Sequence, residues 1–225
     1  GLTLTVEITK AVPAVAVPTV SDIFYRRTAK LSDISINTGM TSVPGEWQWV
    51  LPDKNPTVAE KLYAAKFVPT DSVNYETKTV DVPVSVKPSA VTVTFNATVE
   101  YGDPSPNITA YTYKSDLDPD FRIDAVTTGG NITPSTTYTE GSPVNAEGYP
   151  VTLSAPNYID KAGNYTFSFE NGKIIVVPRN ITFTVENVSV VYGDGFTATA
   201  STVSLTYDAS RLLASDTINS VTADG

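Results

Sequence analysis

The 225-residue sequence contains no cysteine and no histidine, and it has a single methionine. Without histidine or cysteine, neither a Ser-His-Asp nor a Cys-His nucleophile system can be assembled, and there is no imidazole to act as a general base. Thiolate and imidazole ligands for a zinc ion are absent for the same reason. Disulfide bonds are also excluded, so cohesion has to come from the burial of apolar side chains.

Positive charge and long apolar runs are scarce as well. The 15 Lys and Arg residues face 24 Asp and Glu residues, which gives a net charge of -9 and an isoelectric point near 4.4. Because nucleic-acid affinity rests largely on basic side chains that neutralise phosphates, we expect no nucleic-acid partner. No apolar run approaches the roughly 18 residues of a membrane span, so we expect no membrane insertion within this sequence. Residues 1–5 also lack the charged and apolar regions of a signal peptide.

Threonine and valine are what the sequence has in abundance, with 32 and 28 residues. Their branched Cβ atoms suit a pleated, half-buried surface better than a helix. Sixteen prolines and 13 glycines punctuate many short segments, and 41% of the residues are hydrophobic, which is enough for a core. This composition predicts an all-β protein that folds.

An internal repeat organises the chain. Tyr101-Gly102-Asp103 recurs as Tyr192-Gly193-Asp194, 91 residues later, and Asn74-Tyr75 recurs as Asn164-Tyr165, 90 residues later. Each Asn-Tyr pair leads into an apolar strand that ends at a proline, either Pro88 or Pro178. Two independent landmarks with nearly the same period indicate repeated modules.

The strands around these prolines follow a period of two. Val91-Thr92-Val93-Thr94-Phe95 and Ile181-Thr182-Phe183-Thr184-Val185 place apolar side chains on one face and threonine on the other. Val80–Val86 and Ile174–Val177 are the apolar strands that precede them. This pattern is typical of half-buried antiparallel strands. Modules that repeat every 90 or 91 residues fit small β-sandwiches.

The module boundaries follow from these landmarks. Residues 1–10 read as the closing strand of a preceding module, residues 11–87 and 88–178 as two complete modules, and residues 179–225 as a truncated third module. The linkers at Lys87-Pro88 and Pro178-Arg179 are short, and proline restricts their backbone. We therefore expect the modules to lie end to end as a stiff rod. In a narrower alternative, the strand at Leu2–Thr9 pairs with the unfinished third module of a neighbouring molecule.

At these residues the chain resembles the bacterial Ig-like surface repeats called MBG domains. The resemblance rests on the Tyr-Gly-Asp turns, on Ala162–Thr166, and on Asn171-Gly172-Lys173 before Ile174–Val177. Residues 11–87 resemble a related Ig-like surface repeat through Leu31–Ile34, Gly45–Trp49 and Phe67–Asp71, but they carry Tyr25-Arg26-Arg27 in place of Tyr-Gly-Asp. The resemblance implies tandem immunoglobulin-like β-sandwich modules in a bacterial cell-surface, wall-anchored or secreted adhesin-like protein, without a catalytic residue or a defined ligand site.

The recurring turns and tyrosines have a structural interpretation. In each Tyr-Gly-Asp, glycine supplies backbone freedom, aspartate bonds nearby amides and tyrosine packs under the turn. Tyr75 and Tyr165 are expected to be corner residues of a sandwich, with the hydroxyl bonded to nearby backbone.

Trp47 and Trp49 lie two residues apart, so both rings project from the same face of a strand. The favoured interpretation is core packing. The alternatives are a carbohydrate-stacking platform and a contact between modules.

Asp116, Asp118 and Asp120 form an acidic run with oxygen ligands at alternate positions. The EF-hand pattern fails, because Phe121 and Thr127 stand where it needs glycine and glutamate. We expect a solvated acidic loop, with a weak calcium site as the alternative.

Three further possibilities concern covalent chemistry. Paired carboxylates could cleave glycosidic bonds, but none of the 24 acidic residues stands in a recognisable constellation. A Lys-Asn or Lys-Asp isopeptide bond could replace disulfides, although no spacing selects a pair. Six asparagines head N-x-[ST] triplets that would carry glycans only in a eukaryotic secretory path: Asn96, Asn107, Asn131, Asn164, Asn180 and Asn187.

These observations predict a non-enzymatic, monomeric spacer or stalk outside a bacterial cell. We expect no catalytic, cofactor-binding or metal-binding residue, and neighbouring modules as the main partners. The alternative function is direct adhesion to a host glycan or protein through end loops or an exposed sheet edge. The loop rings that would serve it are Phe121, Tyr111, Tyr113 and Tyr138.

Overall fold

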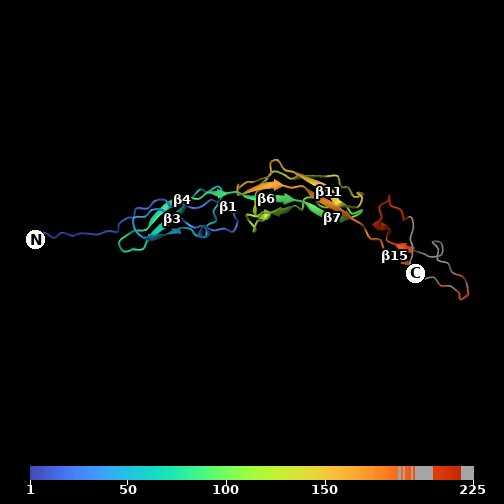
Figure 1. Cartoon of the computed structure of the whole chain (residues 1–225), viewed down its shortest axis with the longest axis horizontal. Helices are drawn as coiled ribbons and strands as arrows, with labels where there is room; N and C mark the ends of the chain where they lie inside the picture. The colour runs from blue at the N-terminus through green and yellow to red at the C-terminus, as the bar shows by residue number, and fades with distance from the viewer. Residues whose placement is uncertain (187–188, 190, 194, 196–204, 219–225) are drawn as a thin grey trace. The chain divides into compact units, whose positions relative to one another are not determined.

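The computed structural model of the chain describes residues 1–186, 189, 191–193, 195 and 205–218. Over these residues the chain consists of short β-strands, irregular loops and three 3₁₀ turns, without an α-helix (Figure 1). The strands are β1 (Ile23–Phe24), β2 (Gly45–Trp49), β3 (Leu62–Pro69), β4 (Lys78–Pro83), β5 (Val86–Lys87), β6 (Ser89–Thr94), β7 (Asn96–Glu100), β8 (Thr112–Lys114), β9 (Thr128–Gly129), β10 (Thr133–Thr136), β11 (Asn145–Ser154), β12 (Ile159–Asp160), β13 (Tyr165–Phe169), β14 (Gly172–Val177), β15 (Phe183–Val185) and β16 (Leu205–Tyr207). The 3₁₀ turns are η1 (Leu31–Asp33), η2 (Ile123–Ala125) and η3 (Ala209–Arg211). The all-β class predicted from composition is confirmed.

Two compact units divide the chain. The first unit comprises Gly1–Thr94, Thr112–Thr133 and Ser154–Glu170, and the second comprises Phe95–Tyr111, Pro134–Leu153 and Asn171–Gly225. The first unit therefore combines the residues of the first predicted module with part of the second. The module boundaries near residues 10, 87 and 178 stay predictions.

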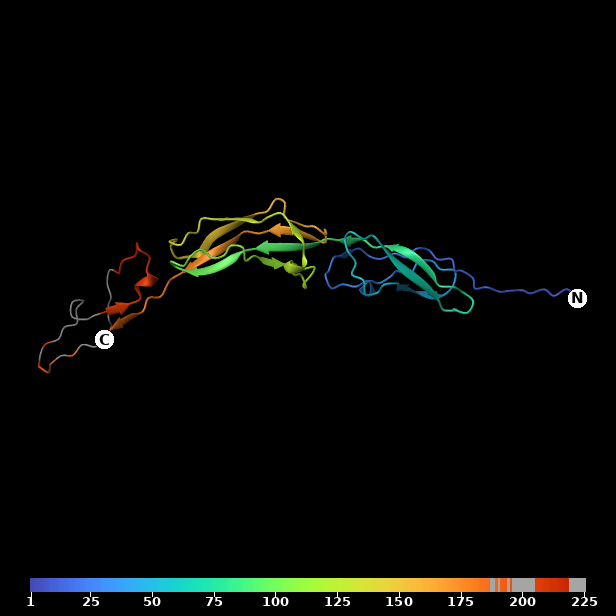
Figure 2. The same ribbon diagram turned by 180° about the vertical axis from the view of Figure 1, so that it is seen from behind.

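The first unit contains two three-stranded sheets. One has the order β2-β3-β4 with antiparallel neighbours, and the other has the order β13-β6-β8. Pairing of β1 with β5 and of β9 with β12 adds two short ladders. Figure 2 shows the ribbon of the chain from behind. Burial alternates along β3, as expected for a strand with one face in the core. Tyr63, Ala65 and Phe67 are buried, and the residues between them are half-buried.

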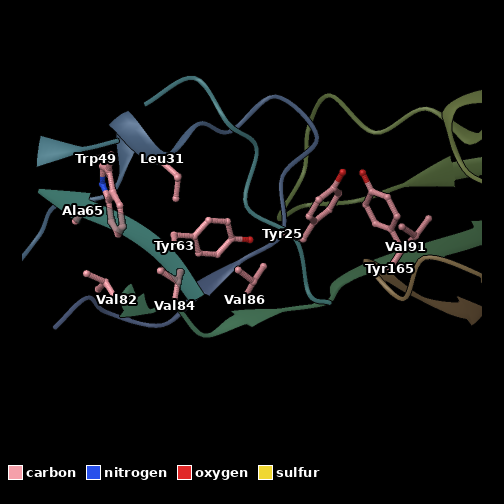
Figure 3. Close-up of a cluster of buried hydrophobic side chains, with 10 residues drawn as sticks. All are labelled: Tyr25, Leu31, Trp49, Tyr63, Ala65, Val82, Val84, Val86, Val91 and Tyr165. Atoms are coloured by element: carbon pink, nitrogen blue, oxygen red, sulfur yellow. The ribbon is translucent and has the colours of Figure 1, made fainter. Parts of the chain in front are cut away.

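A continuous buried cluster fills the first unit. It runs from Trp49, Tyr63 and Val82 to Val91 and Tyr165, and Figure 3 shows these side chains together. On β6 the valines are fully buried and the threonines between them are half-buried, as the alternation predicts. Burial of each such valine stabilises the folded state by about 1.5–3 kcal/mol relative to an exposed side chain.

The second unit contains a four-stranded sheet in the order β10-β11-β14-β7 and the β15–β16 pair. Its core packs Phe95, Val99, Tyr138, Val151, Ile174 and Val176. Gly172 opens β14 where a side chain has no space, because a Cβ atom there would lie 1.6 Å from the carbonyl oxygen of Phe95. The close approach of two backbones accounts for the glycine of the Asn171-Gly172-Lys173 motif.

Strand direction agrees with the prediction only in part. The predicted strand Val91–Phe95 overlaps β6, which is antiparallel to β8, and Ile181–Val185 contains β15, which is antiparallel to β16. On its other edge β6 runs parallel to β13, and β7 runs parallel to β14 and β1 to β5. The period of two does not predict these parallel pairs, because it reports that one face is buried and carries no information about the direction of the neighbouring strand.

Residues 1–10 do not pair with any strand of the described chain, and Leu2, Leu4, Val6 and Ile8 are all at least 71% exposed. A strand is stabilised by its ladder of hydrogen bonds to a neighbour. That this segment is the closing strand of a preceding module stays a prediction.

Candidate functional site

The acidic run is not the solvated loop expected from the sequence. Asp118 is fully buried, while Asp116 and Asp120 are exposed. The Oδ2 atom of Asp118 accepts hydrogen bonds from the Arg27 amide at 3.0 Å and from the Tyr165 hydroxyl at 2.5 Å. Its Oδ1 atom is buried and has no hydrogen-bond partner among the residues that the structure describes. The prediction failed because the two donors stand 91 and 47 residues away in the sequence.

Tyr165 contributes both a hydroxyl and a ring. Its hydroxyl donates to the Asp118 carboxylate and not to nearby backbone, so the expected corner role is wrong in its partner. Burial, together with this hydrogen bond and the carboxylate charge, raises the pKa of Tyr165 above its ordinary value. The ring makes an edge-on contact with Tyr25 (Figure 3), at 5.2 Å between centroids. It makes another with Phe121 at 4.8 Å. At Tyr75 the described hydrogen bond is made by the backbone amide, to the carbonyl four residues earlier.

A second buried carboxylate shapes the turn that precedes Tyr165. Asp160 accepts hydrogen bonds from the amides of Ala162 at 2.9 Å, Asn164 at 2.8 Å and Tyr165 at 3.1 Å. The turn thereby holds the Asn164 side chain where its Oδ1 accepts from the Val58 amide at 3.0 Å. The Ala162–Thr166 motif thus has a local reason, which is a carboxylate-capped turn.

Further hydrogen bonds extend this contact. Arg27 donates from Nε to the Asp120 carbonyl at 3.0 Å, and the Thr28 hydroxyl donates to the Asp120 carboxylate at 2.8 Å. The Ser89 hydroxyl, fully buried, donates to the Tyr25 carbonyl at 2.5 Å. We call this set the aspartate junction: Tyr25, Arg27, Thr28, Val58, Ser89, Asp118, Asp120, Asn164 and Tyr165. Within the first unit it joins residues before Pro88 to residues after it.

The Tyr101-Gly102-Asp103 turn has the chemistry predicted for it. Gly102 has a φ of 78°, and the Asp103 carboxylate accepts from the Glu100 amide at 3.0 Å. Tyr101 does more than pack under the turn, because its hydroxyl donates to Asp216 at 2.8 Å. This hydrogen bond, with burial as a smaller cause, raises the pKa of Tyr101.

Two arginines complete this second site. Arg179 pairs with Asp103 and lies 3.6 Å from Glu100, and Arg211 donates to Glu100 at 3.1 Å. Arg179 is 14% exposed, whereas the Arg211 and Glu100 side chains are 40% and 45% exposed, so solvent screens that pair. We call this set the arginine junction: Glu100, Tyr101, Asp103, Arg179, Arg211 and Asp216. In the second Tyr-Gly-Asp copy, Gly193 has a φ of 98°, and Asp194 lies outside the described residues.

The tryptophans belong to the core, as favoured from the sequence. Trp49 is 7% exposed, and its indole donates to the Ile34 carbonyl at 3.0 Å. Trp47 is half-buried and packs against Phe67, with ring centroids 5.4 Å apart. Neither ring is presented as a platform for a sugar.

The loop rings considered for adhesion are also engaged. Tyr138 is buried and donates its hydroxyl to the Asp103 carbonyl at 3.0 Å. Phe121 and Tyr113 are half-buried against the core of the first unit, and Tyr111 is half-buried against that of the second.

Among the described residues no group of three or more acidic side chains is arranged to hold a metal ion.

The Nζ atom of Lys54 lies 2.5 Å from Oε1 of Glu60. Both side chains are more than a third exposed, as is typical of a surface ion pair. Of the six asparagines, Asn96, Asn107 and Asn164 accept hydrogen bonds with their side chains in the described part of the chain, from the Lys173 amide, from the amide and hydroxyl of Thr109, and from the Val58 amide. Asn187 lies outside the described residues.

No family model, no curated protein and no solved structure matches this chain. In the described part of the chain, no helix is long and apolar enough to cross a membrane.

Proposed function

We propose that this chain is a run of non-enzymatic spacer modules, tandem Ig-like β-sandwiches of the MBG type, in a bacterial cell-surface or secreted adhesin-like protein. The modules act as a stalk that holds another part of the protein away from the cell envelope. Neighbouring modules of the same chain are their main partners.

The aspartate junction is the observation that carries the proposal. A stalk transmits position only if consecutive modules are held by more than a flexible linker, and the junction supplies a buried carboxylate with two donors, a buried hydroxyl and an edge-on pair of rings. Charge-assisted hydrogen bonds in a buried site are strong and directional. The junction therefore restricts bending at the linker that contains Pro88.

The repeat, the short proline linkers and the resemblance to MBG domains give further support. The absence of histidine and cysteine from the sequence is consistent with a structural role. The adhesive alternative is less well supported, since its four candidate rings lie in or against the two cores.

Small-angle scattering with an absolute mass tests the proposal. A stalk gives a monomer whose radius of gyration is well above the roughly 17 Å of a compact 225-residue globule. A compact particle or an oligomer would contradict it. The double substitution Asp118→Ala/Tyr165→Phe should add flexibility to the scattering curve, whereas Tyr63→Phe, which removes a buried hydroxyl outside the junction, should not.

A further inference from the structure

The two junctions are built at equivalent places. The amide of Tyr25 donates to the carbonyl of Lys87 at 2.8 Å, and the amide of Tyr101 donates to the carbonyl of Val177 at 2.9 Å. In both cases the acceptor is the last residue before the linker proline. The turn that begins with each tyrosine therefore lies beside the point where the chain enters the next predicted module.

The loops that meet these turns are equivalent too. On β6, Val93 pairs with Tyr113, and on β15 its repeat counterpart Phe183 pairs with Tyr207. Loop 115–121 follows the first of these tyrosines, and segment 208–216 follows the second. Each turn is thus contacted by the loop after the strand that pairs with β6 or β15, near the start of the next predicted module.

The two junctions differ in charge. The first turn carries Arg26 and Arg27, and its loop carries three aspartates and no basic residue. The second turn carries Glu100 and Asp103. Segment 208–216 carries Asp208 and Asp216 as well as Arg211; Arg211 donates to Glu100, and Asp216 accepts from the Tyr101 hydroxyl. The residue after the linker proline follows the same rule, because it is the neutral Ser89 beside the basic turn and Arg179 beside the acidic turn.

We propose that each turn is a docking surface that selects the loop of the following module by its charge. The basic turn at Tyr25-Arg26-Arg27 accepts the acidic loop 115–121, and the acidic turn at Glu100–Asp103 accepts a loop that offers an arginine. An exchanged pair would place Asp103 beside Asp118 and Asp120, and like charges at such a contact oppose docking. The replacement of Tyr-Gly-Asp by Tyr25-Arg26-Arg27 and the acidic run are then two halves of one contact. The inference rests on the proposed tandem modules and adds that their order is specified.

A charge-reversal cycle at the aspartate junction tests this. Arg27→Asp and Asp120→Arg each place like charges together, whereas the double substitution restores opposite charges. The readout is native-state hydrogen exchange at the Val58 amide, which donates across the junction to Asn164. Each single substitution should accelerate this exchange at least about tenfold, and the double should return it to within about threefold of the unsubstituted chain.

Two controls keep the result decisive. The Val50 amide, directly after β2, donates to the carbonyl of Ala64 on β3. It should keep its protection in every variant, because Asp120 is exposed, Arg27 is only half-buried, and neither belongs to this sheet. Arg27→Lys retains the charge and should change Val58 exchange less than about threefold. The inference is overturned if the single substitutions leave Val58 exchange as it was, or if the double is no better protected than the singles. In either case, acceleration by Asp118→Ala would leave the spacer proposal standing without charge selection.

Discussion

The substitution Tyr165→Phe isolates the central hydrogen bond of the aspartate junction. It removes the hydroxyl that donates to Asp118 at 2.5 Å and keeps the ring that packs against Tyr25 and Phe121. The apolar contacts of the ring are therefore retained. The Asp118 carboxylate keeps the hydrogen bond from the Arg27 amide.

The size of the effect follows from the acceptor. A hydrogen bond to a charged group contributes about 1.5–3 kcal/mol, and Asp118 is fully buried, so little solvent can replace the lost donor. We expect Tyr165→Phe to lower the free energy of unfolding by about 2 kcal/mol. With a urea m-value of about 2 kcal/mol/M, the midpoint should fall by about 1 M.

A double-mutant cycle shows whether the loss belongs to this pair. In the Asp118→Ala background the hydroxyl has lost its acceptor, so Tyr165→Phe should cost less than about 0.5 kcal/mol there, and the coupling energy should exceed about 1 kcal/mol. Tyr63→Phe is a matched control, because its buried hydroxyl accepts from the Thr57 amide in the same unit. It should destabilise the chain without coupling to Asp118→Ala.

Tryptophan fluorescence during urea unfolding is the assay. Trp47 and Trp49 are the only tryptophans and pack in the first predicted module, whereas Tyr165 lies in the second. A shift of the tryptophan signal by Tyr165→Phe would show that the junction couples the two. An effect below about 0.5 kcal/mol in both backgrounds, or a tryptophan midpoint that does not move, would refute the reasoning.

Three further outcomes are expected. Gly172→Ala should lower the free energy of unfolding by at least about 3 kcal/mol, because its Cβ atom would overlap the Phe95 carbonyl. Gly163→Ala, at a φ of 72° in open space, should lower it by about 1–2 kcal/mol. Urea denaturation compares the two variants, and equal effects would contradict the steric argument. The folded chain keeps the Tyr165 proton at pH values where an unfolded tyrosine has lost it. The free energy of unfolding should therefore fall above pH about 10 by about 1.4 kcal/mol per pH unit. An equally steep fall in Tyr165→Phe would argue against Tyr165 as the cause. Asp160→Ala removes the acceptor of three amides and should cost at least about 2 kcal/mol by thermal or urea unfolding, whereas an unchanged midpoint would show that the turn holds without it.

Local patterns predicted the strands and the turn chemistry well. The burial of Val91 and Val93, the positive φ of Gly102 and the core position of Trp49 all follow from neighbouring residues and short-range geometry. These features depend on residues that are adjacent in the sequence, which a single sequence displays directly.

The junctions were not predictable in the same way. Asp118 lies in a run that looks like solvated acid, and its donors come from distant segments. A signal was nevertheless present, because Ser89 and Arg179 follow equivalent prolines and differ in charge as their neighbouring turns do. Strand direction, by contrast, had no signal in the period-two pattern.

The most direct test of the central claim is a distance measurement across the aspartate junction. Because the chain has no cysteine, spin labels can be attached uniquely at Met40→Cys and Thr166→Cys, two exposed positions of the first unit on either side of the junction. Double electron–electron resonance between the two labels should give one narrow distance distribution. This distribution should broaden when Asp118→Ala and Tyr165→Phe are added. A broad distribution with the junction intact, or a narrow one that survives its removal, would contradict the account.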